Sequence, residues 1–484
     1  KVGSATILQN YEPAREGGYR KVLGYTKFSE TLIPGVGDIQ GIKYLNAGEV
    51  IAARNNGAVT EYYIGTGTVW TSIGVAANPG NKISTAEYNF GSTHKVAFVD
   101  GVNYPAIYND TTNTLTFTTT APAAVQGAKY VRSFKNHIFY AKGTQLTFTA
   151  PYSDTDFTPA NGSGVIDIGH TITGMAVFRE VLIVFARNKV LQLTGNSIAD
   201  FVLQPITEDI GCIDGDTIQE IGGDIIYLAP DGLRLLSATN RIDDFALEIA
   251  SSPIEKDARI VIDSTDTYTS MVIRGKSQYR LFAYIPSDTP KNHRGLLATK
   301  FSDQGASRIE WSTLKGFKVH AVDSKYSESG EAIYFANDDG YVYTMESGNS
   351  LDGDNINAIY ESPYMPITDP QIRKTLYKMT LYVSPTGTFS IQCGIKFDFN
   401  RINNAAVIQP PTFEITGTSG GTALWGAPGV TWGSFTFGGD LDKVYVTQLV
   451  GAGKTFAIRF DDNSTNPSHT LDAAIIEFMP NDRQ

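Results

Sequence analysis

The stretch Asp224-Ile-Ile-Tyr-Leu-Ala-Pro-Asp-Gly-Leu-Arg-Leu-Leu236 joins two short apolar runs through a Pro-Asp-Gly turn. Such a pattern is typical of antiparallel β-hairpins, because Asp and Gly accept the backbone conformations of a tight turn. The same strand-turn-strand unit recurs between residues 39 and 358, where no stretch has the periodicity of a long amphipathic helix. The further units lie at residues 49–70, 94–118, 136–148, 181–193, 279–285 and 332–343.

The spacing of these units predicts the fold of the larger part of the chain. They recur about every 40 to 50 residues, which is the spacing of four-stranded propeller blades. We therefore expect an all-β chain in which residues 39–358 form a β-propeller of about six or seven blades. The longest gap between units, residues 240–320, is expected to hold an elongated blade or an insertion. A pair of β-sandwiches would also contain short strands and frequent turns, and it is the alternative fold.

The last part of the chain, residues 359–484, is predicted to be a separate β-sandwich-like domain. A connector is indicated by Pro363, Pro366 and Pro370. Residues 380–383 and 388–393 are expected to pair as a hairpin. The final strands, residues 454–460 and 471–478, alternate inward and outward side chains. Their core is expected to include Trp425, Trp432 and Phe437.

The charge balance limits the function classes. The chain of 484 residues carries 39 basic and 50 acidic residues, a formal net charge of −11, which argues against a surface that grips nucleic-acid phosphates throughout. Residues 1–38 are expected to form an N-terminal arm that packs against either domain. We interpret the charges of this arm as belonging to a solvated or partner-facing strand rather than to a DNA contact. They are Lys1, Arg15, Arg20, Lys21 and Lys27 against Glu12 and Glu16.

Neither the cysteines nor the apolar segments indicate a special environment. Cys212 and Cys393 are far apart and lack a Cys-x-x-Cys pattern, so we expect two buried thiols rather than a disulfide or a zinc site. The N-terminus has no charged-then-apolar leader, and the most apolar stretch, residues 175–186, is interrupted by Arg179 and Glu180. We therefore expect a soluble protein without a membrane span.

A catalytic role has little support in the sequence. A propeller glycosidase needs two carboxylates at a fixed separation, but the aspartates that stand beside glycine in strand-connecting turns are explained by turn formation. These are Asp100, Asp231, Asp338 and Asp339. The segment Gly65-Thr-Gly-Thr-Val-Trp70 lacks the aspartate of the sialidase phrase Ser-x-Asp-x-Gly-x-Thr-Trp. The prediction is therefore a non-enzymatic chain with no catalytic residue.

Metal, cofactor and sugar sites are equally weakly indicated. Asp352-Gly-Asp354-Asn355 lacks the ligand spacing of an EF-hand loop, and the six histidines form no HxH or HExxH pair. We expect no metal site and no cofactor. Aromatic residues on strands can stack on sugars, but packing between blades is the favoured interpretation. The residues concerned are Tyr62, Tyr63, Tyr341 and Tyr343.

The N-terminus carries a phrase that resembles a known family. Gln9-Asn10-Tyr11-Glu12-Pro13, followed by Glu16-Gly-Gly-Tyr-Arg20 and Gly24-Tyr25, is similar to the opening signature of tail nozzle or hub proteins (tail tubular, DNA-stabilisation) of short-tailed bacteriophages. Two further segments agree with this resemblance. They are Tyr152–Pro159 with Asn161–Gly164, and Thr455–Arg459 before Asp461-Asp462-Asn463.

The resemblance implies a structural virion protein of the phage tail. Copies of such proteins, usually six, form a homo-oligomeric ring below the portal and adaptor (connector) proteins and continue the genome-ejection channel. Propellers would stand on the outside and dock tail fibres or spikes, and the second domain would add ring contacts. DNA would pass without sequence-specific binding, and we expect a neutral or acidic channel face, since a wall that does not bind phosphates does not slow a duplex. A carbohydrate-binding or glycan-cleaving propeller is the alternative function.

Overall fold

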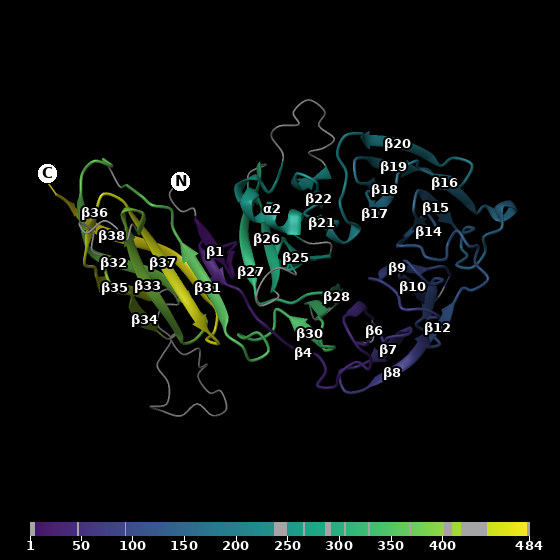
Figure 1. Cartoon of the computed structure of the whole chain (residues 1–484), viewed down its shortest axis with the longest axis horizontal. Helices are drawn as coiled ribbons and strands as arrows, with labels where there is room; N and C mark the ends of the chain where they lie inside the picture. Colours follow the sequence, from purple (N-terminus) through teal and green to yellow (C-terminus); the bar gives the residue numbers. More distant parts are fainter. Residues whose placement is uncertain are drawn as a thin grey trace. The chain divides into compact units, whose positions relative to one another are not determined.

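The computed structural model divides into two compact units (Figure 1). It describes residues 5–45, 48–91, 93–236, 249–264, 267–285, 292–303, 306–327, 330–366, 369–400, 409–417 and 443–481. The propeller unit comprises Lys27–Ile309 and Phe317–Met345, and the sandwich unit comprises Lys1–Thr26, Glu310–Gly316 and Glu346–Gln484. The sequence placed boundaries after residues 38 and 358. In the structure the chain changes unit within the predicted arm, so the arm contributes to both units.

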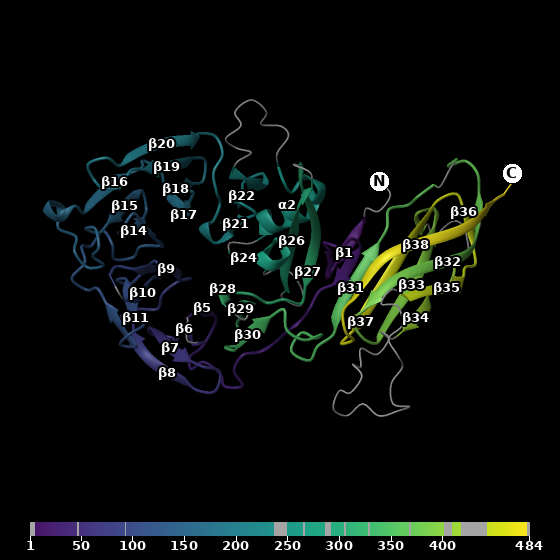
Figure 2. The same ribbon diagram turned by 180° about the vertical axis from the view of Figure 1, so that it is seen from behind.

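The propeller unit is a ring of seven antiparallel sheets, counted over the described residues (Figures 1 and 2). Four consecutive strands form each of the first four blades. Blade 1 is β5 (Ile39–Tyr44), β6 (Val50–Asn55), β7 (Thr60–Gly65) and β8 (Trp70–Val75); blade 2 is β9 (Ser84–Asn89), β10 (His94–Val99), β11 (Ala106–Asn109) and β12 (Thr114–Phe117); blade 3 is β13 (Tyr130–Phe134), β14 (His137–Lys142), β15 (Gln145–Phe148) and β16 (Gly164–Asp167); blade 4 is β17 (Ile172–Phe178), β18 (Val181–Ala186), β19 (Val190–Thr194) and β20 (Val202–Thr207).

The remaining blades are less regular. Blade 5 is described as three strands, and blade 6 contains long strands preceded by the helix α2 (Glu255–Ser264), as the long gap in the repeat pattern predicts. Blade 5 is β21 (Gln219–Ile221), β22 (Asp224–Ala229) and β23 (Gly232–Leu235); blade 6 is β24 (Tyr268–Ile273), β25 (Gln278–Ile285), β26 (Asn292–Asp303) and the first part of β27 (Ala306–Lys315), whose residues from Glu310 onward belong to the sandwich unit; blade 7 is β28 (Ala321–Ser327), β29 (Gly330–Ala336), β30 (Val342–Met345) and β4 (Tyr25–Lys27). Short 3-10 turns are η1 (Pro159–Asn161), η2 (Gly215–Thr217), η3 (Ser252–Ile254), η4 (Arg274–Lys276) and η5 (Asp398–Asn400).

Burial explains why the second strand of each blade was readable from the sequence. All six residues of β22 are buried, as are the first five of β6, whereas the outer strands β8 and β12 have no buried residue. A strand that is covered on both faces consists of a continuous apolar run. Aromatic contacts join neighbouring blades, such as Tyr62 of β7 against Phe98 of β10, with ring centroids 5.7 Å apart. Blade-to-blade packing is therefore the core of the propeller.

The chain ends of the propeller unit close the ring. The N–H of Phe28 donates to the carbonyl of Val342 at 2.8 Å, so the segment that follows β4 pairs with the last blade. A shared apolar cluster then joins that blade to the first one, through residues such as Ile42 and Ala52 of blade 1 and Ala336 of blade 7. Because the outer strand of blade 7 precedes blade 1 in the sequence, the ring is held shut by hydrogen bonds.

The sandwich unit consists of two antiparallel sheets that face a common core. One sheet has the order β1 (Ile7–Gln9), β31 (Ile356–Glu361), β37 (Phe456–Ser464), β33 (Phe389–Phe397), β34 (Phe413–Gly417); the other has the order β2 (Tyr11–Pro13), β3 (Tyr19–Lys21), β38 (His469–Pro480), β32 (Lys374–Pro385), β35 (Lys443–Gln448), with β36 (Ala452–Gly453) beside β32. Leu381 of β32 and Ile391 of β33 are among the residues of the core cluster. The predicted propeller and C-terminal β-sandwich are thus confirmed.

One strand pairing predicted from the sequence is wrong. Residues 380–383 and 388–393 fall in β32 and β33, which do not pair with each other but lie in opposite sheets. Strand β32 has β35 and β38 as neighbours, and β33 has β34 and β37. The alternating side chains of both strands cover the same core from its two sides, so the chain crosses the core after Pro385 instead of folding back within one sheet. Trp425, Trp432 and Phe437, which the sequence assigned to this core, lie outside the described residues.

Candidate functional site

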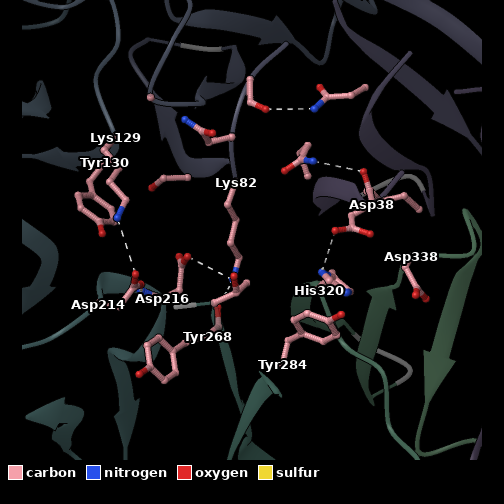
Figure 3. A pocket seen from close by; sticks show the side chains of 18 residues that line it. Asp38, Lys82, Lys129, Tyr130, Asp214, Asp216, Tyr268, Tyr284, His320 and Asp338 are labelled. Atoms are coloured by element: carbon pink, nitrogen blue, oxygen red, sulfur yellow. Dashed lines mark hydrogen bonds and ion pairs between the residues drawn. The ribbon is translucent and has the colours of Figure 1, made fainter. Parts of the chain in front are cut away.

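The axis of the propeller contains a polar cavity of about 750 Å³ (Figure 3). Its walls are residues that stand just before or at the start of the first strands of several blades, together with η2 and the turn after β29. Asp38 precedes β5, Lys82 precedes β9, and His320 precedes β28. The ring brings these residues together although they are spread over most of the propeller sequence. The cavity is therefore the candidate site of the propeller unit.

Lys82 crosses this cavity. Its ammonium lies 3.2 Å from the carboxylate of Asp216 in η2, and it donates to the Thr269 hydroxyl at 2.7 Å and to the carbonyl of Tyr268. Lys82 leads into blade 2, whereas its partners belong to blade 6 and to the turn before blade 5, which are not neighbours of blade 2 in the ring. The side chain therefore bridges the axis, as Figure 3 shows.

A second cation of the cavity is engaged with the same turn. The ammonium of Lys129, which stands before β13, lies 3.7 Å from the carboxylate of Asp214. Asp214 also accepts the backbone N–H of Asp216 at 2.8 Å and so caps η2. Burial, followed by the nearby charge of Asp216, raises the pKa of Asp214. Both carboxylates of this turn thus serve structural contacts.

The opposite wall carries a histidine between two aspartates. Nδ1 of His320 lies 3.6 Å from the Asp38 carboxylate, and Asp338 lines the cavity on the same side. Burial lowers the pKa of His320, although the charges of Asp38 and Asp338 oppose that shift. His320 is therefore mainly neutral at pH 7. With His320 neutral, the four aspartates outweigh the two lysines, and the cavity has net negative charge.

The axis continues past Lys82 to a second charged cluster. Lys43 of β5 lies 2.7 Å from Glu87 of β9 and 3.1 Å from Asp323 of β28, and Lys325 lies 3.3 Å from Glu87. These ion pairs connect blades 1, 2 and 7, which include the closing blade. Although burial opposes the shift, Lys43 and Lys325 together with a hydrogen bond from His94 hold the pKa of Glu87 down at about 2. The cluster contributes to closure of the ring.

The turn aspartates that the sequence singled out have different positions. Asp100 accepts the N–H groups of Val102 and Asn103, and Asp339 accepts that of Tyr341, so both cap their own turns as expected. Asp231 pairs with Arg234, and Asp338 is the member that reaches the cavity. Lys82, Lys129, Asp214 and Asp216 were not predicted; they stand in connections whose proximity depends on the closed ring, and no sequence motif marks them.

Other predicted residues are mostly structural. Tyr62, Tyr63 and Tyr343 are buried, as packing between blades predicts. Cys212 and Cys393 are buried free thiols, as expected, and burial raises the pKa of each to about 12. Over the described part of the chain, no group of three or more His, Cys, Asp or Glu side chains is placed to hold a metal ion, and no helix there is long and apolar enough to cross a membrane.

The signature phrase of the arm is built into the sandwich unit. Asn10, at φ 53°, donates to the carbonyl of Asn357 at 2.9 Å and accepts the N–H of Lys315 at 2.9 Å. The hydroxyl of the buried Tyr11 lies 2.9 Å from Nε2 of His469. A Cβ on Gly24 would stand 1.8 Å from the Ser350 carbonyl oxygen, so only glycine fits there.

The prediction that the charges of this arm are solvated holds for Arg15 and Glu16, which are exposed, but it is wrong for two others. Glu12 and Lys21 are fully buried. Glu12 accepts two hydrogen bonds from Arg20, at 2.9 and 2.7 Å, and Lys21 lies 2.9 Å from Asp462 of β37. Charged residues are rarely buried unless they are paired. Glu12 finds its partner across the β2–β3 hairpin of the arm itself, whereas the Lys21 pair forms only when the arm joins a strand from the other end of the chain. The arm therefore contacts neither solvent nor DNA through these two side chains.

Comparisons with known proteins give no family. No family model and no curated protein matches the chain. Among solved structures, it is similar to a chain of the mitotic checkpoint complex (12% identity, TM-score 0.40, covering 66% of this chain and 93% of that chain) and to YCF48 from Cyanidioschyzon merolae (11%, 0.41, 66% and 98%). An exo-β-1,3-galactanase from Phanerochaete chrysosporium also matches (10%, 0.27, 95% and 100%). At these TM-scores the fold assignment rests on the sheet topology described above.

Proposed function

We propose that this protein is a structural subunit of a phage tail. Copies, six according to the family resemblance, form a nozzle or hub ring that continues the genome-ejection channel below the connector and docks fibres or other tail proteins. The observation that carries the proposal is the position of the opening phrase. The sandwich unit depends on the side chains of this phrase: Asn10 and Tyr11 make hydrogen bonds to distant strands, and Gly24 stands where a Cβ would clash with the Ser350 carbonyl. A phrase of this kind defines a scaffold rather than a ligand site.

The propeller axis fits the role of a rigid building block. Lys82 crosses the cavity and its ammonium is held by Asp216, while Lys129 is held by Asp214. A duplex whose major groove alone is about 12 Å wide cannot pass an axis that a side chain closes. In the proposed assembly the DNA passage therefore lies between copies, and the propellers stand outside it. A net charge of −11 per copy keeps phosphate contacts weak.

The assembly state tests this proposal. Mass photometry of the purified full chain, alone and with the connector proteins, should show a discrete species of six copies, either spontaneously or when the connector is added. A chain that stays monomeric in both conditions would exclude the ring.

A carbohydrate-binding or glycan-cleaving propeller is the second candidate, and the axial cavity is the observation that favours it. Four aspartates line the cavity together with Tyr130, Tyr268 and Tyr284, and carboxylates with aromatic faces are a common means of holding sugars. Glycan arrays and glycosidase assays should be negative under the structural proposal. Glycan binding that is abolished by Asp216→Asn, but not by Asp231→Asn at an outer turn, would favour the second candidate instead.

A further inference from the structure

The outward face of one sandwich sheet is apolar. Strands β35, β32 and β38 lie side by side in the sheet (Figures 1 and 2). In one cross-strand row Val446 stands opposite Thr380, which stands opposite Ile475; in the next row Val444 stands opposite Tyr382, which stands opposite Ala473. The alternate residues of β32, such as Leu381, point into the core. We call Val444, Val446, Tyr382, Thr380, Ala473 and Ile475 the face patch.

The face patch is open to solvent. Val444 is 51% exposed, Val446 60% and Ile475 51%. The outward face of an antiparallel sheet is usually polar when water covers it. Soluble monomers rarely expose contiguous apolar patches larger than a few hundred Å², and the largest patch on a protein is often a binding surface. The contiguity here is set by strand register, so the patch is three strands wide.

Polar rows border the face patch at both ends. On one side Gln448, Lys378 and Glu477 stand in register, and the Lys378 ammonium lies 2.6 Å from Glu477. On the other side Ser384 donates to the Asp472 carboxylate at 2.5 Å. An apolar centre with a polar rim is the arrangement of protein–protein interfaces. Within the face patch itself there is no charged side chain, so covering it desolvates no charge.

We propose that the face patch docks a second copy of this chain. The inference rests on the proposed ring. Area supports it: the three half-exposed residues, with the contributions of Tyr382 and Ala473, offer on the order of 350 Å² of apolar surface, which is the larger share of what one side of an interface needs. One side of a standard interface buries about 800 Å², of which about 65% is apolar in homodimers, or roughly 500 Å². Charge supports it too, because two chains of net charge −11 repel each other and approach best through an uncharged surface.

The test replaces the apolar centre with polar side chains of the same branching. In the triple variant Val444→Thr, Val446→Thr, Ile475→Thr all positions keep β-branched side chains that suit a strand. The matched control is Val165→Thr, Val177→Thr, Val202→Thr, three valines of the propeller that are 54%, 41% and 48% exposed. Sedimentation velocity of the full chain over a concentration series should show self-association weakened on the order of 100-fold in the first variant and unchanged in the control.

A thiol probe gives a readout that does not depend on weakening the assembly. The native thiols Cys212 and Cys393 are buried. In Val446→Cys the introduced thiol is therefore the one that reacts readily with a maleimide. Its maleimide labelling should be fast in dilute protein and slow in the assembled species, whereas Val202→Cys should label equally in both.

The outcomes separate the inference from the proposed function. Assembly of the Thr variant at wild-type strength, or equal labelling of Val446→Cys in both states, would overturn docking at the face patch and leave the ring intact. If the Thr variant assembles at wild-type strength but no longer binds a connector or fibre protein, the face patch belongs to that partner and the inference is also overturned. A wild-type chain that never self-associates would overturn both.

Discussion

Removing one partner of the buried pair Lys21 and Asp462 should destabilise the sandwich unit strongly. The two side chains are 1% and 0% exposed and their charged atoms are 2.9 Å apart. Lys21 also donates to the Ser464 carbonyl at 3.1 Å, and the Ser464 hydroxyl donates to Asp462 at 2.5 Å. Burial lowers the pKa of Lys21 and raises that of Asp462, while their mutual attraction opposes both shifts. The attraction between the two charges therefore offsets the cost of burying them only while both are present.

Lys21→Met leaves the Asp462 carboxylate buried without its counter-charge. Breaking a buried pair on one side costs about 3–5 kcal/mol, which for a unit of this size lowers Tm by roughly 6–20 °C. The double variant Lys21→Met, Asp462→Leu removes both charges and should recover most of that loss, giving a coupling free energy of at least about 2 kcal/mol. Asp462 can take up a proton in the single variant, and burial raises the pKa of this carboxyl. The stability lost in Lys21→Met should therefore shrink as the pH falls towards the ordinary carboxyl range.

Calorimetry can measure this through the unfolding transition of the sandwich unit, with hydrogen exchange of peptides covering β3 and β38 as a local readout. The matched control is Lys378→Met, whose ammonium makes an ion pair with Glu477 in which the side chains are 39% and 55% exposed; it should cost less than about 1 kcal/mol. Equal and small losses in Lys21→Met and Lys378→Met would refute the reasoning.

Three further predictions concern other parts of the fold. The folded-state pKa of Glu87, about 2, lies below its usual value. The stability that ionised Glu87 contributes is therefore full above about pH 4.5 and is lost as the pH falls towards 2. Because the Glu87 side chain is a third exposed, Glu87→Gln should lower the free energy of unfolding by about 1 kcal/mol at pH 7 and flatten the pH dependence of Tm across that window. Gly24→Ala should cost about 2 kcal/mol or more in urea unfolding, because its Cβ would meet the Ser350 carbonyl, whereas Gly275→Ala, with nothing within 4 Å, should be nearly neutral. Lys82→Met should lower the Tm of the propeller by the equivalent of about 1–2 kcal/mol by breaking its contacts across the axis, while leaving the assembly state in sedimentation unchanged.

The features that the sequence predicted depend on short-range patterns. Strands β6 and β22 are visible as apolar runs because both of their faces are buried, and their spacing gives the blades. Closure was not predictable, because the bond from Phe28 to Val342 joins residues more than 300 positions apart. The alternation of residues 380–393 shows which side chains face the core, but it does not show which of the two sheets each strand belongs to. For that reason the predicted hairpin of residues 380–383 and 388–393 was wrong.

The candidate site and the buried charges were largely hidden from sequence reasoning. Lys82 and Asp216 stand in ordinary polar connections, and their contact follows only from ring geometry. Glu12 and Lys21 look like surface charges in the sequence, but Glu12 is buried against Arg20 of the same hairpin and Lys21 against Asp462 of a distant strand. Exposed Val446 and Ile475 look like strand residues in sequence, and only the register shows that they share one outward face.

Electron microscopy of the purified chain, alone and bound to its connector, tests the central claim most directly. The account predicts class averages of a closed ring of six copies, with propellers at the periphery and an open passage between the copies. Solitary particles under both conditions, from a preparation that binds or hydrolyses a glycan, would contradict it.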